Sequence, residues 1–346
     1  MTVRPDFLLR RILLDSLGLP KIGGPCMDAI VVHRLGAPDV LQTGHRPVPE
    51  PAPGEVLVRL HAIGVNFSDT ERRRGVYDPP ALPWTPGNEG AGTVERAGSG
   101  AEAWVGRRVA FWAMRTSGCY AQYATVAAAA LFHLRDDIDF PTGAALPAQG
   151  LTAYGLASVS TALGSGQSAL VHAAAGGVGA LLVQLLVRRG VRVFGTAGAA
   201  KLPLVEVAGA EPMPYGRDLA DRVREATGGR GVDAVFDSVG RDTQEASLAA
   251  LALYGRLVWF GDSSGPPDPV SPDALYPRNL GVSAFWLAAD PPERWEQARR
   301  ELQEWVAAGA LRVAIDRTYP LAQAAEAHRR LEARETRGKL ILVPDR

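Results

Sequence analysis

The feature that most constrains the fold is a glycine-rich turn after an apolar stretch near the middle of the chain. A strand is expected over 168–173, the turn reads AAGGVG over 174–179, and a helix follows. Glycine lets a backbone approach a pyrophosphate closely, and the N–H groups at a helix start point at the anion. Compared with the pattern G-x-G-x-x-G, Gly176 and Gly179 are kept and Ala174 replaces the first glycine. The turn therefore predicts a dinucleotide site, with a tight turn that binds no ligand as the alternative.

Beyond residue 150, apolar strands alternate with helical stretches. Strands are expected over 168–173, 192–196, 232–237 and 256–261, with helices over 179–189, 219–227 and 243–253. The chain then closes with a strand over 281–285, a helix over 293–308, a strand over 313–319, a helix over 322–333 and a strand over 339–343. This alternation predicts an α/β fold with a doubly wound parallel sheet that helices cover on both faces.

The chain from 27 to 148 has a different pattern, in which proline and glycine clusters separate short apolar strands. The strands are expected over 29–33, 56–65, 92–97, 108–112 and 120–126. This pattern predicts an irregular all-β domain. A length of 346 residues with 47% hydrophobic content also favours two domains over one.

Charge and composition exclude several classes of protein. Lys and Arg number 37 and Asp and Glu number 37, so the formal net charge of zero favours neither nucleic acid nor an anionic membrane as a partner. No apolar run reaches the roughly 18 to 20 residues of a membrane-spanning helix. Two cysteines form no disulfide framework, which indicates a reducing compartment, and we expect a cytoplasmic protein. Residues 1–26 are expected to be a frayed extension, with a docking helix as the alternative.

The end of the second strand of the α/β part indicates which nicotinamide cofactor is bound. Enzymes that prefer NAD usually carry a carboxylate there for the ribose 2′-hydroxyl. Here the chain reads GTAGAAK over 195–201, with no carboxylate and with Lys201 at its end. An ammonium attracts a 2′-phosphate, so we expect NADPH; the alternative for Lys201 is an ordinary solvated lysine.

Four stretches together resemble a known family. They are VNFSDTERRRGVY (65–77), PWTPGNEGAGTVERAGSG (83–100), LVHAAAGGVG (170–179) and VFDSVGRDT (235–243). The chain from 27 to 344 is similar to the zinc-independent quinone oxidoreductases of the medium-chain dehydrogenase/reductase superfamily, the group that includes zeta-crystallin. The resemblance implies a GroES-like, mostly β substrate domain over 27–149 and 287–346. It also implies a Rossmann NADPH-binding domain inserted over 150–286.

The resemblance also implies a set of cofactor contacts and an oligomeric state. Lys201, Tyr215 and Arg334 would hold the 2′-phosphate. The nicotinamide side would involve Asn66, Thr152, Phe260 and Gly261. The remaining expected cofactor contacts are Ala174, Gly176, Gly177, Val178, Gly179, Thr196 and Ser263. Family members are commonly homodimers, and pairing of an exposed sheet edge over 282–285 is the expected route.

Zinc alcohol dehydrogenases are relatives of that family, but their metal ligands are missing here. The positions similar to the three ligands are Asn66, Asn88 and Ala148. Asparagine is a poor zinc ligand and alanine is none, so no metal is expected. Glu89 is then interpreted as a structural carboxylate, and none of the six histidines forms a pair with metal-ligand spacing.

Without a metal, reduction of a conjugated acceptor is the expected chemistry, because the negative charge spreads into an oxygen that needs only a hydrogen-bond donor. The resemblance makes Asn66 and Tyr77 the candidate catalytic donors. Glu71 stands where the family often has another tyrosine, which puts the usual quinone pocket in doubt. A small-molecule quinone is the expected substrate. The alternatives are an enoyl or alkenal reductase acting on a conjugated C=C bond, and a non-catalytic, crystallin-like NADPH-binding protein.

Overall fold

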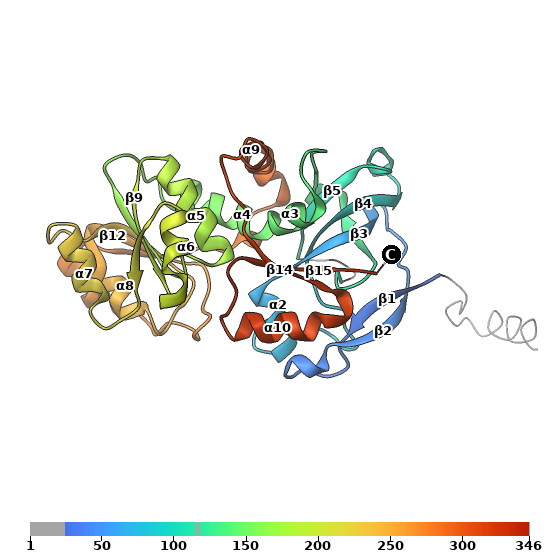
Figure 1. Ribbon diagram of the computed structural model, residues 1–346, viewed down its shortest axis with the longest axis horizontal. Coiled ribbons are helices and arrows are strands. Elements are labelled where there is room, and N and C mark those ends of the chain that lie inside the picture. The colour runs from blue at the N-terminus through green and yellow to red at the C-terminus, as the bar shows by residue number, and fades with distance from the viewer. Residues whose placement is uncertain (1–24, 115, 117, 346) are drawn as a thin grey trace, which may run out of the picture.

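The structure is a computed structural model, and it describes residues 25–114, 116 and 118–345 (Figure 1). Residues 1–24 of the expected N-terminal extension lie outside this part. The first strand begins at Cys26, one residue before the expected start of the folded chain. Within the described residues, no helix combines the length and apolar character needed to cross a membrane.

Six strands of the described chain form a parallel sheet in the order β10-β9-β8-β11-β12-β13. They are β8 (Ser168–Val171), β9 (Arg192–Ala197), β10 (Glu211–Pro214), β11 (Val232–Asp237), β12 (Leu251–Trp259) and β13 (Gly281–Ala284). The helices between them are α5 (Gly177–Arg188), α6 (Leu202–Val207), α7 (Leu219–Ala226) and α8 (Gln244–Ala250). From the central pair β8 and β11, successive strands are added outward in opposite directions, β9 and β10 on one side and β12 and β13 on the other. The predicted doubly wound α/β sheet is therefore confirmed. Ligands bind at the carboxyl ends of the strands at such a switch point.

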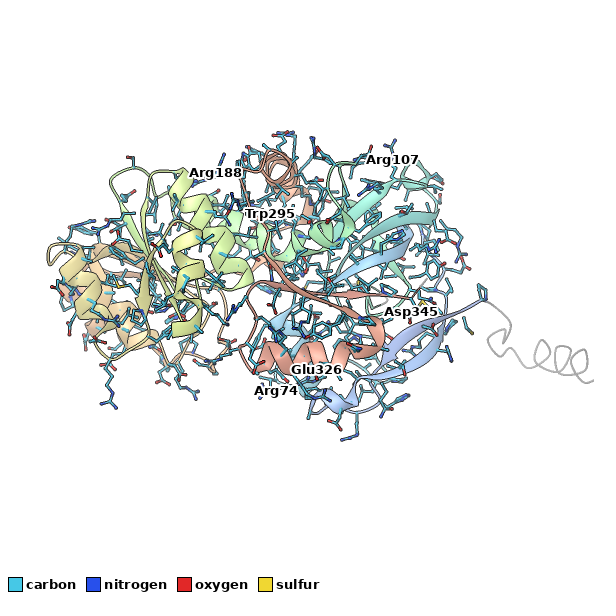
Figure 2. The ribbon with its side chains drawn as sticks, viewed as in Figure 1. Arg74, Arg107, Arg188, Trp295, Glu326 and Asp345 are labelled. Carbon is cyan, nitrogen blue, oxygen red and sulfur yellow. The ribbon has the colours of Figure 1, made fainter. Side chains whose placement is uncertain are left out.

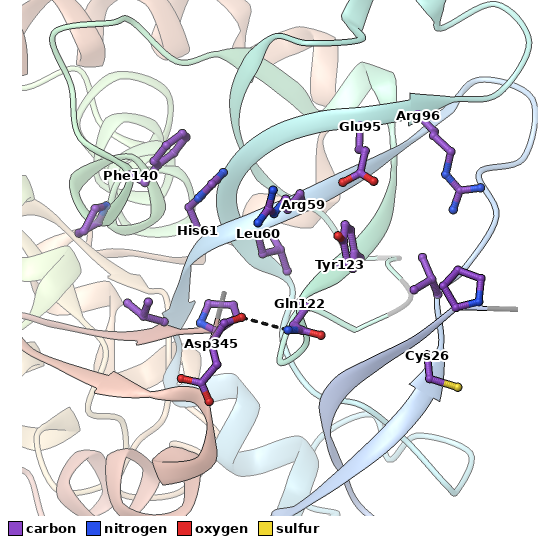
Figure 3. Close-up of a pocket in the computed structure, with 15 residues that line it drawn as sticks. Cys26, Arg59, Leu60, His61, Glu95, Arg96, Gln122, Tyr123, Phe140 and Asp345 are labelled. Atoms are coloured by element: carbon purple, nitrogen blue, oxygen red, sulfur yellow. Dashed lines mark hydrogen bonds between the residues drawn. The ribbon is translucent and has the colours of Figure 1, made fainter. Parts of the chain in front are cut away.

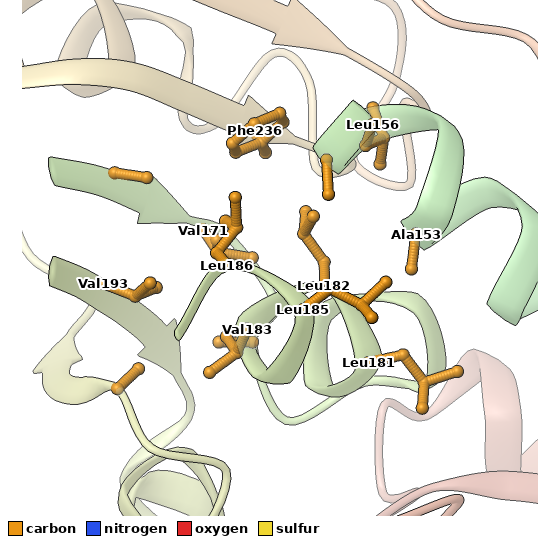
Figure 4. Close-up of a cluster of buried hydrophobic side chains, with 14 of the residues drawn as sticks. Ala153, Leu156, Val171, Leu181, Leu182, Val183, Leu185, Leu186, Val193 and Phe236 are labelled. Carbon is orange, nitrogen blue, oxygen red and sulfur yellow. The ribbon is translucent and has the colours of Figure 1, made fainter. Parts of the chain in front are cut away.

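Alternating side chains of the sheet build two separate apolar cores. Val171 and Phe236 pack with the apolar face of α5, as Figure 4 shows. Their strand neighbours Leu170 and Val235 point to the other face, toward α7 and α8. Both faces are therefore buried, which is why these strands read as continuous apolar runs.

Seven further described strands form a second sheet, in the order β14-β15-β3-β4-β5-β7 with β6 on β3. They are β3 (Glu55–Val65), β4 (Glu89–Ala97), β5 (Arg108–Trp112), β6 (Tyr123–Ala127), β7 (Leu131–His133), β14 (Ile315–Pro320) and β15 (Lys339–Val343). β15 runs antiparallel to β3, with Leu340 opposite Val65. The C-terminal tail thus lies among N-terminal elements, where Figure 1 shows red strands beside blue ones.

Short elements complete the molecule around this second sheet. They are the hairpin of β1 (Cys26–Val31) and β2 (Gln42–Pro47), and α10 (Ala324–Glu332). Helix α9 (Glu296–Ala307) instead buries Ala298 and Leu302 in the apolar core that contains α5. α10 packs beside α2 (Phe67–Arg74), and their labelled side chains Arg74 and Glu326 stand along the lower edge in Figure 2.

The expectation of an all-β region over 27–148 is wrong, because three helices lie in or begin in it. They are α2, α3 (Phe140–Ala145) and α4 (Pro147–Gly155). α2 has a capping box in which Asn66 and Asp69 satisfy each other's backbone N–H groups, and it ends at Gly75 with φ of 76°. These are ordinary signals for the start and end of a helix. The helix was not predicted because its sequence, FSDTERRR, has almost no apolar residues from which to read a helical period.

The expected helix over 243–253 is also too long, because α8 ends at Ala250 and β12 begins at Leu251. Leu251 pairs with Val232 at the start of β11, and a bulge follows it. Pairing with a neighbouring strand outweighs the helix propensity of residues 251–253. The expected helix over 293–308 likewise becomes regular only at Glu296.

Candidate active site

The predicted glycine turn lies at the carboxyl end of β8, beside the switch point. Gly176 caps α5 in an extended conformation, and a Cβ there would meet only the Ala173 carbonyl oxygen, at 3.0 Å. A Cβ at Gly179 would instead run into the Ala173 backbone, and one at Gly177 into the Gln149 side chain. Gly176 therefore leaves open space above the helix start, whereas the other two glycines allow close packing.

Of the remaining predicted residues of this turn, Ala174 lies before α5 and Val178 lies within it, because α5 begins at Gly177, two residues before the expected helix start. The Ala174 N–H donates to the carbonyl oxygen of Thr196 at the end of β9, at 2.8 Å. Val178 lies in the first turn of α5, whose N–H groups have no partner within the helix. The turn thus offers several backbone donors and a helix dipole to an anion.

A cavity of about 590 Å³ lies beyond the end of β9, at the turn over 198–201. Its lining is strongly charged and consists of Gly198, Ala199, Ala200, Lys201, Asp316, Arg330, Arg334, Glu335 and Arg337. The Lys201 ammonium donates to the Arg334 carbonyl oxygen at 2.6 Å, and burial lowers the pKa of Lys201. Two of the three residues expected at the 2′-phosphate, Lys201 and Arg334, therefore line one cavity.

Tyr215 is placed differently from the other two residues expected at the 2′-phosphate. It is not among the residues that line the cavity; its hydroxyl accepts a hydrogen bond from the Ala173 N–H at 3.0 Å, and its ring stacks on His172. Sequence reasoning missed Arg337, whose guanidinium has no hydrogen bond or ion pair to any other described residue. No local motif marks Arg337, because it reaches the cavity only through the return of the C-terminal tail.

Phe260, Gly261 and Ser263 follow β12 in a loop beside the carboxyl end of β11. The Phe260 N–H donates to the Asp237 carbonyl oxygen at 2.9 Å. Arg334 donates to the Ser263 carbonyl oxygen at 3.2 Å, which ties this loop to the C-terminal tail. The loop thus lies at the carboxyl ends of β11 and β12, the edge of a doubly wound sheet at which ligands bind.

Asn66 lies at the end of β3, in contact with a buried ion pair. The Lys339 ammonium lies 2.6 Å from Glu89 Oε2 and donates to Asn66 Oδ1 at 2.7 Å. Asn66 Nδ2 donates to Glu89 Oε2 at 2.9 Å. The Ala148 N–H donates to Glu89 Oε1 at 2.6 Å. Glu89 thus pairs with Lys339, a partner that the sequence did not reveal.

Helix α4 joins this cluster to the glycine turn. Ala148 in its first turn contacts Glu89, and the next residue, Gln149, lies against Gly177. Thr152, one turn further along α4, is half-buried. Adjacent residues of α4 thus connect the start of α5 to Glu89, the residue to which the Asn66 amide donates.

Two further groups of interest follow Asn66 on α2 and the loop after it. Tyr77 is 36% exposed, and the burial of the rest of its side chain together with the Asp78 carboxylate raises the pKa of its hydroxyl. Burial and the Asp262 carboxylate raise the pKa of Glu71 to about 7. Since Asp262 belongs to the loop that contains Gly261 and Ser263, Glu71 lies close enough to that loop for the Asp262 charge to act on it. The residue that departs from the family pattern is therefore a carboxyl group that holds a proton near neutral pH.

A buried chain of hydrogen bonds lies behind α2. Burial raises the pKa of Asp69 to about 6, and Asp69 accepts from the Asn66 N–H at 2.9 Å and from the Tyr120 hydroxyl at 3.3 Å. His328 Nε2 lies 2.9 Å from the same hydroxyl, and Arg73 lies 3.3 Å from His328 Nδ1. Arg73 can only donate, so His328 carries its proton on Nε2. Burial and Arg73 lower the pKa of His328 to about 3.

A second cavity, of about 550 Å³, lies at the seven-stranded sheet and is lined by residues such as Arg59, His61, Glu95 and Tyr123 (Figure 3). It contains none of the predicted site residues. Among the described residues, no group of three or more His, Cys, Asp or Glu side chains could hold a metal ion.

These features define a class: a Rossmann-type parallel sheet joined to a GroES-like β domain, as in medium-chain dehydrogenases/reductases. The chain matches the family model for the alcohol dehydrogenase GroES-like domain over residues 52–136. It matches the model for a zinc-binding dehydrogenase over residues 208–342.

Individual relatives indicate to which family of this superfamily the chain belongs. A quinone oxidoreductase of Pseudomonas aeruginosa is 41% identical over 316 residues, covering 89% of this chain and 97% of the relative. A 2-haloacrylate reductase of a Burkholderia species is 34% identical, covering 91% and 98%. The solved structure of an Escherichia coli quinone oxidoreductase complexed with NADPH has a TM-score of 0.87 and 36% identity, covering 92% of this chain and 100% of that one. The chain belongs to the quinone oxidoreductase family of the medium-chain dehydrogenase/reductase superfamily.

Proposed function

We propose that the protein reduces quinones by hydride transfer from NADPH, without a metal ion. The observation that carries the proposal is the position of Asn66, connected to the glycine turn through Glu89 and α4 and held by the buried Lys339 ammonium. The homologous quinone oxidoreductases support the same reaction.

The residues present fit NADPH. The open space above Gly176 suits the pyrophosphate, because no side chain fills it. Lys201, Arg334 and Arg337 would hold the 2′-phosphate in the charged cavity, where arginine can bind two phosphate oxygens at once. When bound, the cofactor supplies a hydride from its nicotinamide ring.

The acceptor side needs a hydrogen-bond donor and a proton, and this chain offers both. As the acceptor gains a hydride, negative charge develops on its oxygen, and the Asn66 amide and the Tyr77 hydroxyl would donate to that oxygen. Glu71 would supply the proton, because its carboxyl group is partly protonated at neutral pH.

The proposed independence from zinc rests on the donor set. Of the positions that resemble zinc ligands, Asn66 offers its oxygen to Lys339, and Ala148 offers only a backbone N–H, which donates to Glu89. An ammonium 2.6 Å from the Glu89 carboxylate would repel a divalent cation. The chain would thus provide an internal positive charge where its zinc-dependent relatives bind a metal.

Stopped-flow measurement of NADPH absorbance with simple benzoquinones and naphthoquinones tests this function. We expect turnover that a chelator does not reduce and that added zinc does not increase. No consumption of NADPH with any quinone at high enzyme concentration, or activity that depends on zinc, would contradict the proposal.

A second candidate is reduction of a conjugated C=C bond, which the similarity to the 2-haloacrylate reductase favours. The protonated Glu71 at the crevice suits it, since an enolate must be protonated to complete the reaction. Product analysis separates the two candidates: a saturated C–C bond indicates the enone reductase and a hydroquinone indicates the quinone reductase.

We also propose that the protein is a cytoplasmic homodimer with the two-domain division expected from the family. The edge strand β13 supports the dimer, because Ser283 and Ala284 are exposed and β13 pairs only with β12 among the described strands. Light scattering on the wild type and on Ser283→Pro tests this: we expect a dimer that the substitution weakens, and a monomeric wild type would contradict it.

A further inference from the structure

The Asn66 side chain lies between two buried charges that come from distant parts of the chain. Glu89 begins β4 and Lys339 begins β15, and the side chains of both have an exposed fraction of 0%. The pairing of β15 with β3 brings Lys339 to the end of β3, where Asn66 follows Val65. The fold therefore takes a full ion pair out of water beside this one amide, and only close pairing and further hydrogen bonds offset the desolvation of two charges.

These two charges determine which way the amide points. An ammonium can only donate, so the atom beside Lys339 must be the amide oxygen; a carboxylate can only accept, so the atom beside Glu89 must be the amide nitrogen. The flipped amide would put NH₂ against NH₃⁺ and oxygen against a carboxylate. The pair thus selects one of two orientations that an asparagine side chain would otherwise both adopt.

The surroundings fix the remaining degrees of freedom. The Asn66 backbone N–H donates to Asp69, and the Ala148 N–H holds the second oxygen of Glu89. Gly64 in β3 makes room for that carboxylate, because a Cβ there would collide with Glu89 and lie 2.7 Å from the Ala144 carbonyl oxygen. With its oxygen and one N–H occupied, the amide keeps a single N–H that no other described residue accepts.

We propose that Lys339 and Glu89 are positioning residues that hold the Asn66 amide with its one free N–H directed at the ligand. This inference rests on the proposed function, in which that N–H donates to the developing oxygen anion of the acceptor. It assigns the buried pair a role beyond stability: the pair prevents the amide oxygen, which would repel the anion, from taking the donor's place.

The test compares Asn66→Ala in two backgrounds, the wild type and the double variant Glu89→Gln with Lys339→Met. The double variant removes both charges together, since removing one would leave the other buried and unpaired. The matched control removes an ion pair far from the crevice, Arg192→Met with Glu211→Gln, whose side chains are about half exposed. Thermal unfolding and NADPH fluorescence titration establish that each variant folds and binds cofactor.

We expect Asn66→Ala to lower kcat by about 100-fold in the wild type, the usual effect of losing a donor to an oxyanion. In the double variant the same substitution should lower kcat less than about 10-fold, because the amide there is no longer held in the donating orientation. The control pair should leave the full effect of Asn66→Ala in place. An equal loss in both backgrounds would overturn the proposal.

A spectroscopic measurement decides the question independently of turnover. The Asn66 side-chain NH₂ pair, assigned by its disappearance in Asn66→Ala, should give two sharp NMR proton signals that exchange slowly with water. In the double variant these signals should broaden or exchange faster, whereas unchanged signals would overturn the proposal. If the wild type reduced no quinone or enone, the proposed function would fail, and the NMR comparison would still judge the positioning role.

Discussion

Arg337 offers the sharpest test of how the protein selects its cofactor, because its role can be removed without disturbing the fold. The side chain is exposed and lines the charged cavity beside Lys201 and Arg334. No described residue pairs with its guanidinium. By contrast, Arg330 in the same cavity is already bound to Asp316 at 2.8 Å. Arg337→Met should therefore remove a free positive charge and leave the native contacts intact.

The size of the effect follows from the charges involved. A hydrogen bond to a charged group contributes about 1.5–3 kcal/mol, and an exposed site lies at the lower end of that range. Loss of about 1.4 kcal/mol weakens binding tenfold. We expect the Kd of NADPH to rise about 10-fold in Arg337→Met, and the Kd of NADH, which has no 2′-phosphate, to stay within a factor of about two.

Nicotinamide fluorescence titration with both cofactors measures this ratio, and repeating it at higher salt should reduce the difference between wild type and variant. Arg329→Met is the matched control, because it removes the same charge from α10 at an exposed position outside the cavity. Equal weakening of NADPH and NADH, or an equal effect of the control, would refute the assignment of Arg337 to the 2′-phosphate.

Three further predictions follow from the site. Gly176→Ala should fold and raise the NADPH Kd at least about 10-fold, because its Cβ enters the space proposed for the pyrophosphate. Gly179→Ala, whose Cβ meets the Ala173 backbone, should lower the free energy of unfolding by about 1–3 kcal/mol. Chemical denaturation and NADPH titration distinguish the two effects, and equal destabilisation by both substitutions would contradict this. Because the pKa of Glu71 is about 7, kcat should fall as pH rises through 7 in the wild type and stay flat in Glu71→Gln; parallel pH–rate profiles would exclude its role as proton donor. The pKa of His328 is about 3, so the folded state excludes a proton that the unfolded state binds below pH of about 6.5, and stability is lost as pH falls through that window. From pH 7 to 5 this loss is about 2 kcal/mol in urea unfolding; it should be absent in His328→Gln, and an identical pH dependence in the variant would refute it.

The sequence predicted the nucleotide-binding half of the molecule well because its signals are local. The predicted strands and helices of that half are continuous apolar or amphipathic segments, and β11 (Val232–Asp237) has the predicted bounds. The short helix α6 and the edge strand β10 were not predicted, because β10 reads EPMP and is mostly exposed, without an apolar pattern. The glycine turn combines a strand end, a close backbone approach and a helix start within a few residues, so one short motif identifies it. Lys201 was found in the same way, by counting from the turn to the end of the next strand.

The residues that the sequence did not reveal share a different property. Arg337 and Lys339 reach the site only because the C-terminal tail returns and pairs with β3, and Lys339 lies 273 positions from the Asn66 that it contacts. Hydrophobic periodicity identifies β15 as a strand but not as the neighbour of β3, since strand pairing over such a separation leaves no local pattern.

The same long-range pairing explains how the site is assembled. α4 carries the Glu89 contact and the Gly177 contact on adjacent residues, and the tail carries the cavity residues Arg334 and Arg337 together with Lys339 over 334–339. In the proposed function, both segments would therefore contact the cofactor and also support the Asn66 amide that faces the acceptor. A shift of either segment would move the Asn66 amide and the proposed nucleotide contacts together. The distance between the Asn66 N–H and the bound nicotinamide would therefore change little. The tail connects the two regions because β15 pairs with β3 and the residues just before β15 line the charged cavity. That pairing buries the Lys339 side chain, and the Glu89 carboxylate beside it compensates the buried charge.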